Sequence, residues 1–129
     1  MMDTYFKQDA IYTEKYGNNC IFLMQCGTFF EVYGRQDSTG NFLNSKIENF
    51  ARICDMTIAP KSTPGRNGKK HQTYKGNRIF MAGFSPIERL DKYVMRLTEN
   101  GFVVPVWIQD EKVPSIRSEL GVYTPGTNF

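Results

Sequence analysis

Residues 25–34 read Gln-Cys-Gly-Thr-Phe-Phe-Glu-Val-Tyr-Gly, and the predicted fold is built outward from them. An apolar run at residues 20–24 precedes this stretch and has the length and branching of a buried strand. Gly27 and Thr28 then offer a two-residue turn with glycine first, which is typical of a type II′ hairpin. The sequence therefore predicts two antiparallel strands joined at residues 27–28.

The strand after this turn has two different faces, because successive side chains of a strand point in opposite directions. Phe30 and Val32 share one face, while Phe29, Glu31 and Tyr33 share the other. An aromatic ring that projects beside a turn can wedge between stacked bases, and a neighbouring carboxylate can accept a hydrogen bond from a base edge. Phenylalanine is also a common core residue, so a packing role for Phe29 stays open at this point.

The composition indicates one globular domain. The chain has 129 residues, of which 40% are hydrophobic and 22% charged, and these values are ordinary for a soluble protein. Its net charge of +3 permits nucleic-acid binding without requiring it. No apolar run approaches the roughly 20 residues of a membrane span, and the N-terminus lacks a secretory signal pattern. We therefore expect an intracellular protein with no membrane partner.

Residues that usually carry metal or catalytic chemistry are sparse. The three cysteines form no C-x-x-C pair, which fits free thiols in a reducing compartment, and His71 is the single histidine. No zinc site is therefore expected. P-loop and G-x-S-x-G patterns are absent, and no spaced pair of acids suggests a catalytic centre. The chain is predicted to be no enzyme and to bind no cofactor.

Helical and strand-like segments interleave along the chain. Strands beyond the hairpin are predicted at residues 56–59, 79–84, 102–109 and 121–123, with Pro105 marking either a sheet edge or a bulge. Helices are predicted at residues 3–16, 45–54 and 86–97, the last two beginning with capping boxes at Ser45 and Ser85. This order predicts an α/β fold in a single domain, with a mixed β-sheet flanked by about three helices.

Apolar spacing assigns a buried side to each of these helices. In the first helix this side carries Phe6 and Ala10, with three further candidates, Tyr5, Ile11 and Tyr12. The second helix is expected to bury Ile47, Phe50, Ala51 and Cys54, and the third Ile87, Leu90, Val94 and Leu97.

Residues 61–78 differ in composition from the rest of the chain. They contain six of its sixteen basic residues and no acidic one, which leaves ten basic against thirteen acidic residues elsewhere. The glycines of this segment favour a mobile loop over a helix. Two interpretations stay open, a solvated basic loop and a loop that contacts phosphate groups.

The hairpin sequence and several later blocks resemble one protein family. Residues 27–33, Gly-Thr-Phe-Phe-Glu-Val-Tyr, resemble the Gly-x-Phe-Tyr-Glu-Leu-Phe stretch of the MutS DNA mismatch-repair proteins. Further similar blocks follow in the same order at residues 51–58, 81–84, 90–97, 101–109 and 122–127. The resemblance covers nearly the whole chain, residues 1–129, and corresponds to the family's N-terminal mismatch-recognition domain, which is also a mixed sheet flanked by helices.

The resemblance implies a function, a partner and a set of site residues. The partner is mismatched double-stranded DNA, in which Phe29 stacks on the mispaired base and Glu31 hydrogen-bonds the displaced base. Lys61 falls where many relatives contact the DNA backbone, and Met81 lies in a segment near the DNA, although a buried strand is an equal interpretation there. Arg78 and Lys70 are candidates from their charge alone. The connector, lever, clamp and ATPase domains of the family, with their ATP, magnesium and dimer contacts, lie outside these residues.

Some positions depart from the family pattern. Thr28 replaces a common Asp, Phe30 replaces a common Tyr, and residues 61–78 are longer than in typical bacterial members. The intact pair of Phe29 and Glu31 favours mismatch recognition over the meiotic branches of the family. Two alternatives remain. One is a protein-interaction or structural module, in which Phe29 and Glu31 are packing and surface residues and the basic loop docks an acidic partner. The other is an RNA-binding domain that uses the basic segment.

Overall fold

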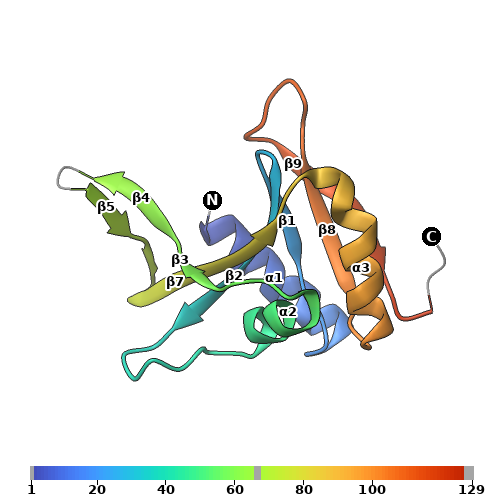
Figure 1. Cartoon of the computed structure of the whole chain (residues 1–129), viewed down its shortest axis with the longest axis horizontal. Helices are drawn as coiled ribbons and strands as arrows, with labels where there is room; N and C mark the ends of the chain where they lie inside the picture. The colour runs from blue at the N-terminus through green and yellow to red at the C-terminus, as the bar shows by residue number, and fades with distance from the viewer. Residues whose placement is uncertain (1, 66–67, 127–129) are drawn as a thin grey trace.

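The computed structural model describes residues 2–65 and 68–126, which form a mixed β-sheet with helices on both of its faces (Figure 1). Within these residues the main sheet has seven strands in the order β3-β7-β2-β1-β8-β9, with β6 pairing to β7 beside this path. Strands β1 and β8 are parallel, and the other pairs are antiparallel. The predicted class, an α/β single domain with a mixed sheet and three helices, is confirmed.

The main-sheet strands are β1 (Leu23–Cys26), β2 (Phe29–Gln36), β3 (Ala59–Pro60), β6 (Thr73–Tyr74), β7 (Asn77–Phe84), β8 (Val104–Gln109) and β9 (Arg117–Tyr123). A separate two-stranded ribbon consists of β4 (Ser62–Gly65) and β5 (Gly68–His71). The helices are α1 (Met2–Tyr16), α2 (Lys46–Cys54) and α3 (Leu90–Glu99). A 3₁₀ turn, Ile87–Arg89, leads directly into α3.

The β1–β2 hairpin has the predicted turn. Cys26 and Phe29 are cross-strand partners, so only Gly27 and Thr28 lie between the two strands. Gly27 has a φ of +65°, the positive value that the first central residue of a type II′ turn requires. Because β1 also pairs with β8 and β2 with β7, this hairpin lies in the middle of the sheet.

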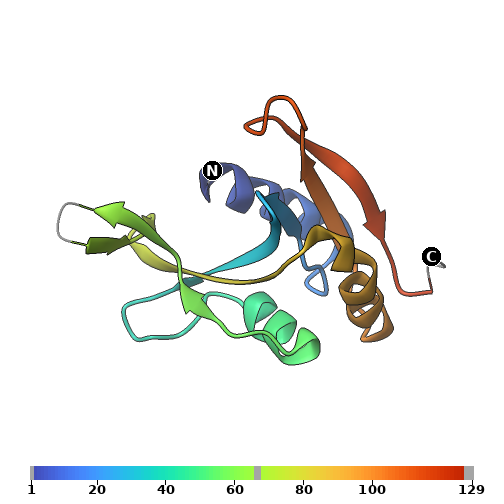
Figure 2. The same ribbon diagram turned by 45° about the horizontal axis from the view of Figure 1, so that its top comes forward.

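The two faces of the sheet pack against different helices (Figure 2). Helices α2 and α3 cover the face that carries Phe30 and Val32, which are 2% and 1% exposed. Helix α1 covers the other face, where Tyr5 stacks on Phe22 at a centroid distance of 4.8 Å and meets Tyr33 edge to face. We call these the α2/α3 face and the α1 face. The predicted alternation along β2 is confirmed, because Phe30 and Tyr33 belong to separate hydrophobic clusters.

Each predicted helix face needs some correction, and in α2 Ala51 is only partly buried. Ala10 and Ile11 are exposed, and the buried residues of α1 are Met2, Tyr5, Asp9 and Tyr12. Tyrosine can be buried here because its hydroxyl finds a partner, as when the Tyr5 hydroxyl donates to the carbonyl of Phe22 at 2.9 Å. Ile87 is 39% exposed, because it lies in the 3₁₀ turn before α3.

Neither predicted capping box forms. The Ser45 side chain makes no capping hydrogen bond, and the side-chain oxygen of Asn44 accepts from the backbone N–H of Lys46 at 3.0 Å instead. Pro86 is extended and precedes the 3₁₀ turn, so the α-helix begins at Leu90. The prediction failed because a neighbouring side chain or a 3₁₀ turn can satisfy the same backbone groups.

The described residues of the basic segment, 61–65 and 68–78, are mostly β-structure and not the predicted loop, while residues 66–67 of that prediction lie outside the described residues. Strand β4 pairs with β5 from Ser62↔His71 to Gly65↔Gly68, and β6 then pairs with β7. Its side chains are mostly polar, so no alternation of apolar residues marked it as a strand.

Strand β8 is an interior strand, because it pairs with β1 on one side and β9 on the other. Of the two possibilities predicted for Pro105, the edge is therefore wrong, and a register shift at Val106/Trp107 supports the bulge. Strand β9 begins at Arg117, four residues earlier than predicted. None of the described helices is long and apolar enough to cross a bilayer.

Candidate nucleic-acid interface

Phe29 lies at the first position of β2, directly after the hairpin turn, and is 43% exposed. The next residue, Phe30, is 2% exposed, so the strand places two adjacent phenylalanine rings in opposite environments. Single exposed apolar side chains are common on protein surfaces, and what distinguishes Phe29 is that its ring is exposed beside a hairpin turn, on the face of the strand that carries Glu31. Phe29 is therefore the first candidate for contact with a ligand.

The turn that carries Phe29 is braced against the end of β8. The backbone N–H of Gly27 donates to the side-chain oxygen of Gln109 at 2.8 Å. In return the backbone N–H of Gln109 donates to the side-chain oxygen of Gln25 at 2.8 Å, and the Gln25 amide donates to the carbonyl of Gly27 at 3.0 Å. These bonds fix the turn before any ligand binds, which lowers the entropy that binding must overcome.

Glu31 is the next residue on the same face, and it is almost completely buried, with 3% exposed. Its Oε1 atom accepts a hydrogen bond from the Tyr33 hydroxyl at 2.6 Å and forms an ion pair with the Lys61 ammonium at 3.2 Å. Burial and the charge of Glu31 raise the pKa of Tyr33 well above its ordinary value, so its hydroxyl stays protonated and donates. Both contacts are made by the same carboxylate oxygen, Oε1.

Lys61 follows β3, and its backbone N–H donates to the carbonyl of Ile79 at 2.9 Å. Only 16% of its side chain is exposed, and its ammonium lies 5.4 Å from the centroid of the Tyr33 ring. The charge of Lys61 is therefore partly neutralised inside the protein by Glu31. A phosphate group would have to compete with this carboxylate for the ammonium.

Strand β7 approaches Glu31 closely at Gly83. The two residues are cross-strand partners, and a Cβ atom at position 83 would lie 2.5 Å from the carbonyl oxygen of Phe30. Glycine is thus required here for β2 and β7 to pair. Met81, two residues away, is the cross-strand partner of Tyr33 and is partly buried in the cluster under α1.

Arg78 lies apart from the other predicted site residues. It pairs with Gln36 at the end of β2 opposite to Phe29. Its side chain points to the α2/α3 face, where the guanidinium donates to Nδ1 of His71 and lies 5.5 Å from the centroid of Phe80. The structure thus brings Phe29, Glu31 and Lys61 to one side of the sheet. Met81 lies on the neighbouring strand, opposite Tyr33, and Arg78 is separated from this group.

Sequence reasoning missed the residues that hold the site in place. The contact between Tyr33 and Glu31 could have been predicted, because residues i and i+2 of a strand share a face. The bracing of Gln25 by Gln109 joins residues 84 positions apart, and no local pattern indicates it.

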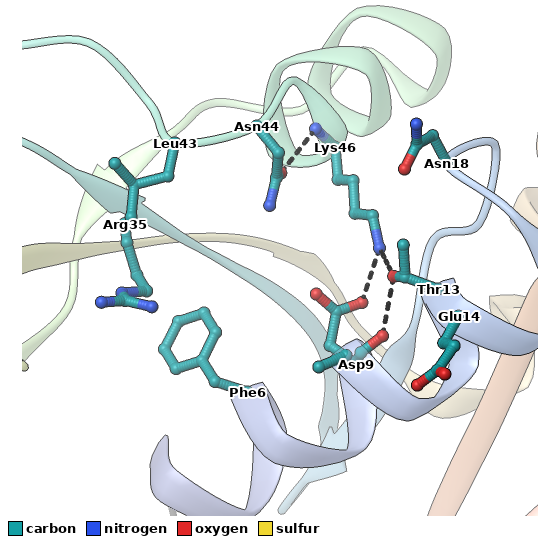
Figure 3. Close-up of a pocket in the computed structure, with 10 residues that line it drawn as sticks. Phe6, Asp9, Thr13, Glu14, Asn18, Arg35, Leu43, Asn44 and Lys46 are labelled. Atoms are coloured by element: carbon teal, nitrogen blue, oxygen red, sulfur yellow. Dashed lines mark hydrogen bonds and ion pairs between the residues drawn. The ribbon is translucent and has the colours of Figure 1, made fainter.

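A hollow of about 560 Å³ lies between α1, the end of β2 and the start of α2 (Figure 3). Its walls include Lys46, whose ammonium donates to Asp9 at 3.0 Å and to the hydroxyl of Thr13. Burial raises the pKa of Asp9, and the charge of Lys46 opposes this effect. Arg35 on its rim is near the end of β2 remote from Phe29. The polar side chains of this wall are therefore used to hold α1 and α2 together.

The described part of the chain has no clustered metal-ligating side chains. Residues 2–65 and 68–126 contain no cluster of three or more His, Cys, Asp or Glu side chains that could hold a metal ion. Burial raises the pKa of Cys20 to about 11 and that of Cys54 to about 12, so both remain neutral thiols near pH 7.

The comparisons with known proteins add no assignment. The sequence matches no model of a known protein family, and no curated protein matches it significantly.

Proposed function

We propose that this chain is a DNA-binding domain that recognises mispaired or unpaired bases in duplex DNA, with Phe29 as the side chain that enters the base stack. The observation that carries the proposal is the 43% exposure of Phe29 on a braced turn, directly beside the buried Phe30. The sequence resemblance to the recognition domain of the MutS family supports the same function.

The physical basis of recognition is the low cost of deforming a mismatch. A mispaired base is poorly held in the helix, so unstacking and kinking cost less there than in paired DNA. Stacking of an aromatic ring on the freed base contributes about 1–3 kcal/mol. Because the turn is already fixed, most of this contact energy is available for discrimination.

Glu31 would read the displaced base through Oε2. Tyr33 and Lys61 hold the carboxylate through Oε1, so its orientation is set before DNA arrives. A carboxylate near DNA phosphates is repelled, which lowers affinity for every duplex that offers no donor. In this proposal Lys61 orients Glu31 and lowers that repulsion, in addition to any contact with the backbone.

The resemblance also suggests what the remainder of a longer protein would supply. ATP hydrolysis, magnesium binding and dimerisation would belong to domains outside these 129 residues, and the present chain would contribute recognition without catalysis. A protein with this function would act inside the cell, where its DNA is.

The test is fluorescence anisotropy at low salt with three duplexes, one with a G·T mismatch, one with an unpaired T and one fully paired. We expect tighter binding to the first two, and we expect Phe29→Ala to abolish this preference. Met95→Ala, which removes a side chain of similar exposure (44%) from α3, is the matched control and should leave the preference unchanged. Equal affinity for all three duplexes, unaffected by Phe29→Ala, would refute the wedge.

A second candidate function is docking of a partner protein. The segment between β8 and β9 exposes Val113 and Ile116 at 46% and 56%, and β9 exposes Leu120 at 46%. This segment contacts the hairpin indirectly, because the Gln109 amide donates to the carbonyl of Pro114 at 3.1 Å. A contiguous apolar surface formed by these residues would favour an interface with a protein. This candidate predicts no measurable binding to any of the three duplexes.

A further inference from the structure

The β4–β5 ribbon extends away from the helices and from the main sheet (Figures 1 and 2). Its base is held by one hydrogen bond between the two ends of the ribbon and by others to β7. The Gln72 N–H donates to the carbonyl of Lys61 at 2.8 Å, and the Ile79 N–H donates to the carbonyl of Gln72 at 3.0 Å. The His71 ring donates from Nε2 to the carbonyl of Ile79 at 2.8 Å. The direction in which the ribbon leaves the sheet is therefore fixed.

The pleat of the ribbon sorts its basic residues onto two faces. Lys61 points to the α1 face, where it meets Glu31. Thr63 lies two residues further and so shares this face, and its cross-strand partner is Lys70. His71 is on the opposite face, where its ring packs on Phe80 at a centroid distance of 5.2 Å.

Lys70 is thus on the same face as Phe29, whereas Arg78 is on the other. Phe29, Glu31 and Lys61 share the α1 face. The ribbon is a separate sheet, and side-chain alternation from Lys61 to Thr63 relates Lys70 to the side of Lys61. Arg78 donates to His71 on the α2/α3 face. From charge alone, Lys70 and Arg78 were equal candidates for contact with DNA. Their positions on opposite faces distinguish them.

The charge of Lys70 is available to a ligand. Its residue is exposed, and no carboxylate among the described residues forms an ion pair with it. Residues 61–78 contain no acidic side chain that could neutralise it. By contrast, Lys61 is already paired with Glu31.

We infer that the β4–β5 ribbon binds the phosphate backbone of the duplex beside the lesion through Lys70. This inference rests on the proposed function, because it assigns the ribbon to the DNA that Phe29 enters. A phosphate contact holds the duplex in register and adds affinity that does not depend on the base sequence. Phe29 discriminates between duplexes, and the ribbon strengthens binding to all of them.

The test compares two variants that lose the same charge. Lys70→Gln and Arg78→Gln each remove one basic residue from the same segment, one from each face. Binding to the paired and the G·T duplex is measured by anisotropy between about 50 and 200 mM salt. Lys92→Gln, on the exposed side of α3, is a second charge-matched control that leaves the ribbon untouched.

We expect Lys70→Gln to weaken binding to both duplexes equally and to lower the salt slope by about 0.9, since one phosphate contact is lost. When the salt concentration rises fourfold, the affinity of Lys70→Gln should therefore fall about 3.5-fold less than that of the wild-type protein. Arg78→Gln and Lys92→Gln should both show the same salt slope as the wild-type protein. Mismatch preference should survive in Lys70→Gln.

An equal change of slope in Lys70→Gln and Arg78→Gln would overturn the inference, because it would show a general effect of charge. An unchanged slope in Lys70→Gln would overturn it as well. A different result would refute the proposed wedge, namely a preference for mismatched DNA that persists in Phe29→Ala. The slope is read from the paired duplex, so the ribbon can be tested even where the wedge fails.

Discussion

Phe29 and Phe30 show how much a single position in a strand decides. The alternation of side chains predicts from sequence that these rings have opposite environments, and the exposures of 43% and 2% agree. The sequence could not predict whether a helix covers either face at the tip of the hairpin. That depends on how far α1 extends over the sheet. Helix α1 covers Tyr33 but leaves Phe29 accessible.

The environment of Glu31 could be predicted only in part. Its neighbour on the same face, Tyr33, follows from strand geometry, whereas Lys61 lies 30 residues further along the chain. Only the pairing of β3 with β7 and of β7 with β2 brings Lys61 to this carboxylate. Family resemblance suggested a phosphate contact for Lys61, and the structure gives it a partner inside the protein.

We predict that Lys61→Met lowers the free energy of unfolding by about 3 kcal/mol, because it leaves the buried carboxylate of Glu31 without its counter-charge. Urea denaturation measures this change. The double variant Lys61→Met with Glu31→Gln should recover most of the loss. Lys7→Met removes the exposed ion pair with Asp3 and should have no measurable effect. Equal losses in the two lysine variants would contradict the account of Glu31.

Among the elements, the hairpin was the most predictable and the ribbon the least. Gly27-Thr28 carries its own turn geometry, so local sequence was sufficient. The ribbon has a polar sequence with glycines, which is the composition of a loop, and its pairing is set by the backbone alone. Composition predicted its charge correctly but could not predict that Lys70 and Arg78 lie on opposite faces.

The hairpin also provides a chemical probe of the interface. Cys26 is the cross-strand partner of Phe29 and is partly exposed, whereas Cys20 and Cys54 are buried. Burial raises the pKa of Cys20 to about 11 and of Cys54 to about 12, so neither forms appreciable thiolate at pH 8. We predict that iodoacetamide modifies Cys26 first, as measured by mass spectrometry of the digested protein.

Binding of DNA should change this reactivity. A duplex that Phe29 enters covers Cys26, so mismatched DNA should slow its modification more than paired DNA does. The two buried cysteines serve as internal controls, because their rates should stay the same in every sample. Fast modification of Cys26 in the presence of saturating mismatched DNA would place the duplex away from the hairpin.

At the scale of the whole molecule, interleaved strand and helix signals were enough to predict the α/β class. The order of the strands was not predictable, because the parallel pair of the described sheet, β1 with β8, joins segments about 80 residues apart. That pair makes the hairpin an interior element and gives Gln109 its position beside the turn. The rigidity of the candidate interface is therefore a property of the complete fold.

The buried tyrosines between α1 and the sheet predict how stability depends on pH. Burial and a hydrogen bond to Glu119 raise the pKa of Tyr12 to about 12, and burial raises the pKa of Tyr5 and Tyr33 as well. In the unfolded chain these groups lose their protons near pH 10. Above that pH the unfolded state binds fewer protons than the native state, so the free energy of unfolding should fall as pH rises from about 10 to 12.

Urea denaturation at about pH 9 and pH 11 tests this expectation. Tyr12→Phe should reduce the loss at the higher pH, because phenylalanine has no proton to lose. A free energy of unfolding that is the same at both values would mean that these hydroxyls are not buried in solution.

The central claim is that Phe29 enters the base stack at a mismatch, and the most direct measurement is the fluorescence of aminopurine, a base analogue, placed beside an unpaired T. Stacking quenches this fluorescence, so insertion of a side chain should raise it. We predict a rise with the wild-type protein and none with Phe29→Ala at saturating protein. An equal rise with both proteins, or no rise with bound wild-type protein, would contradict the account.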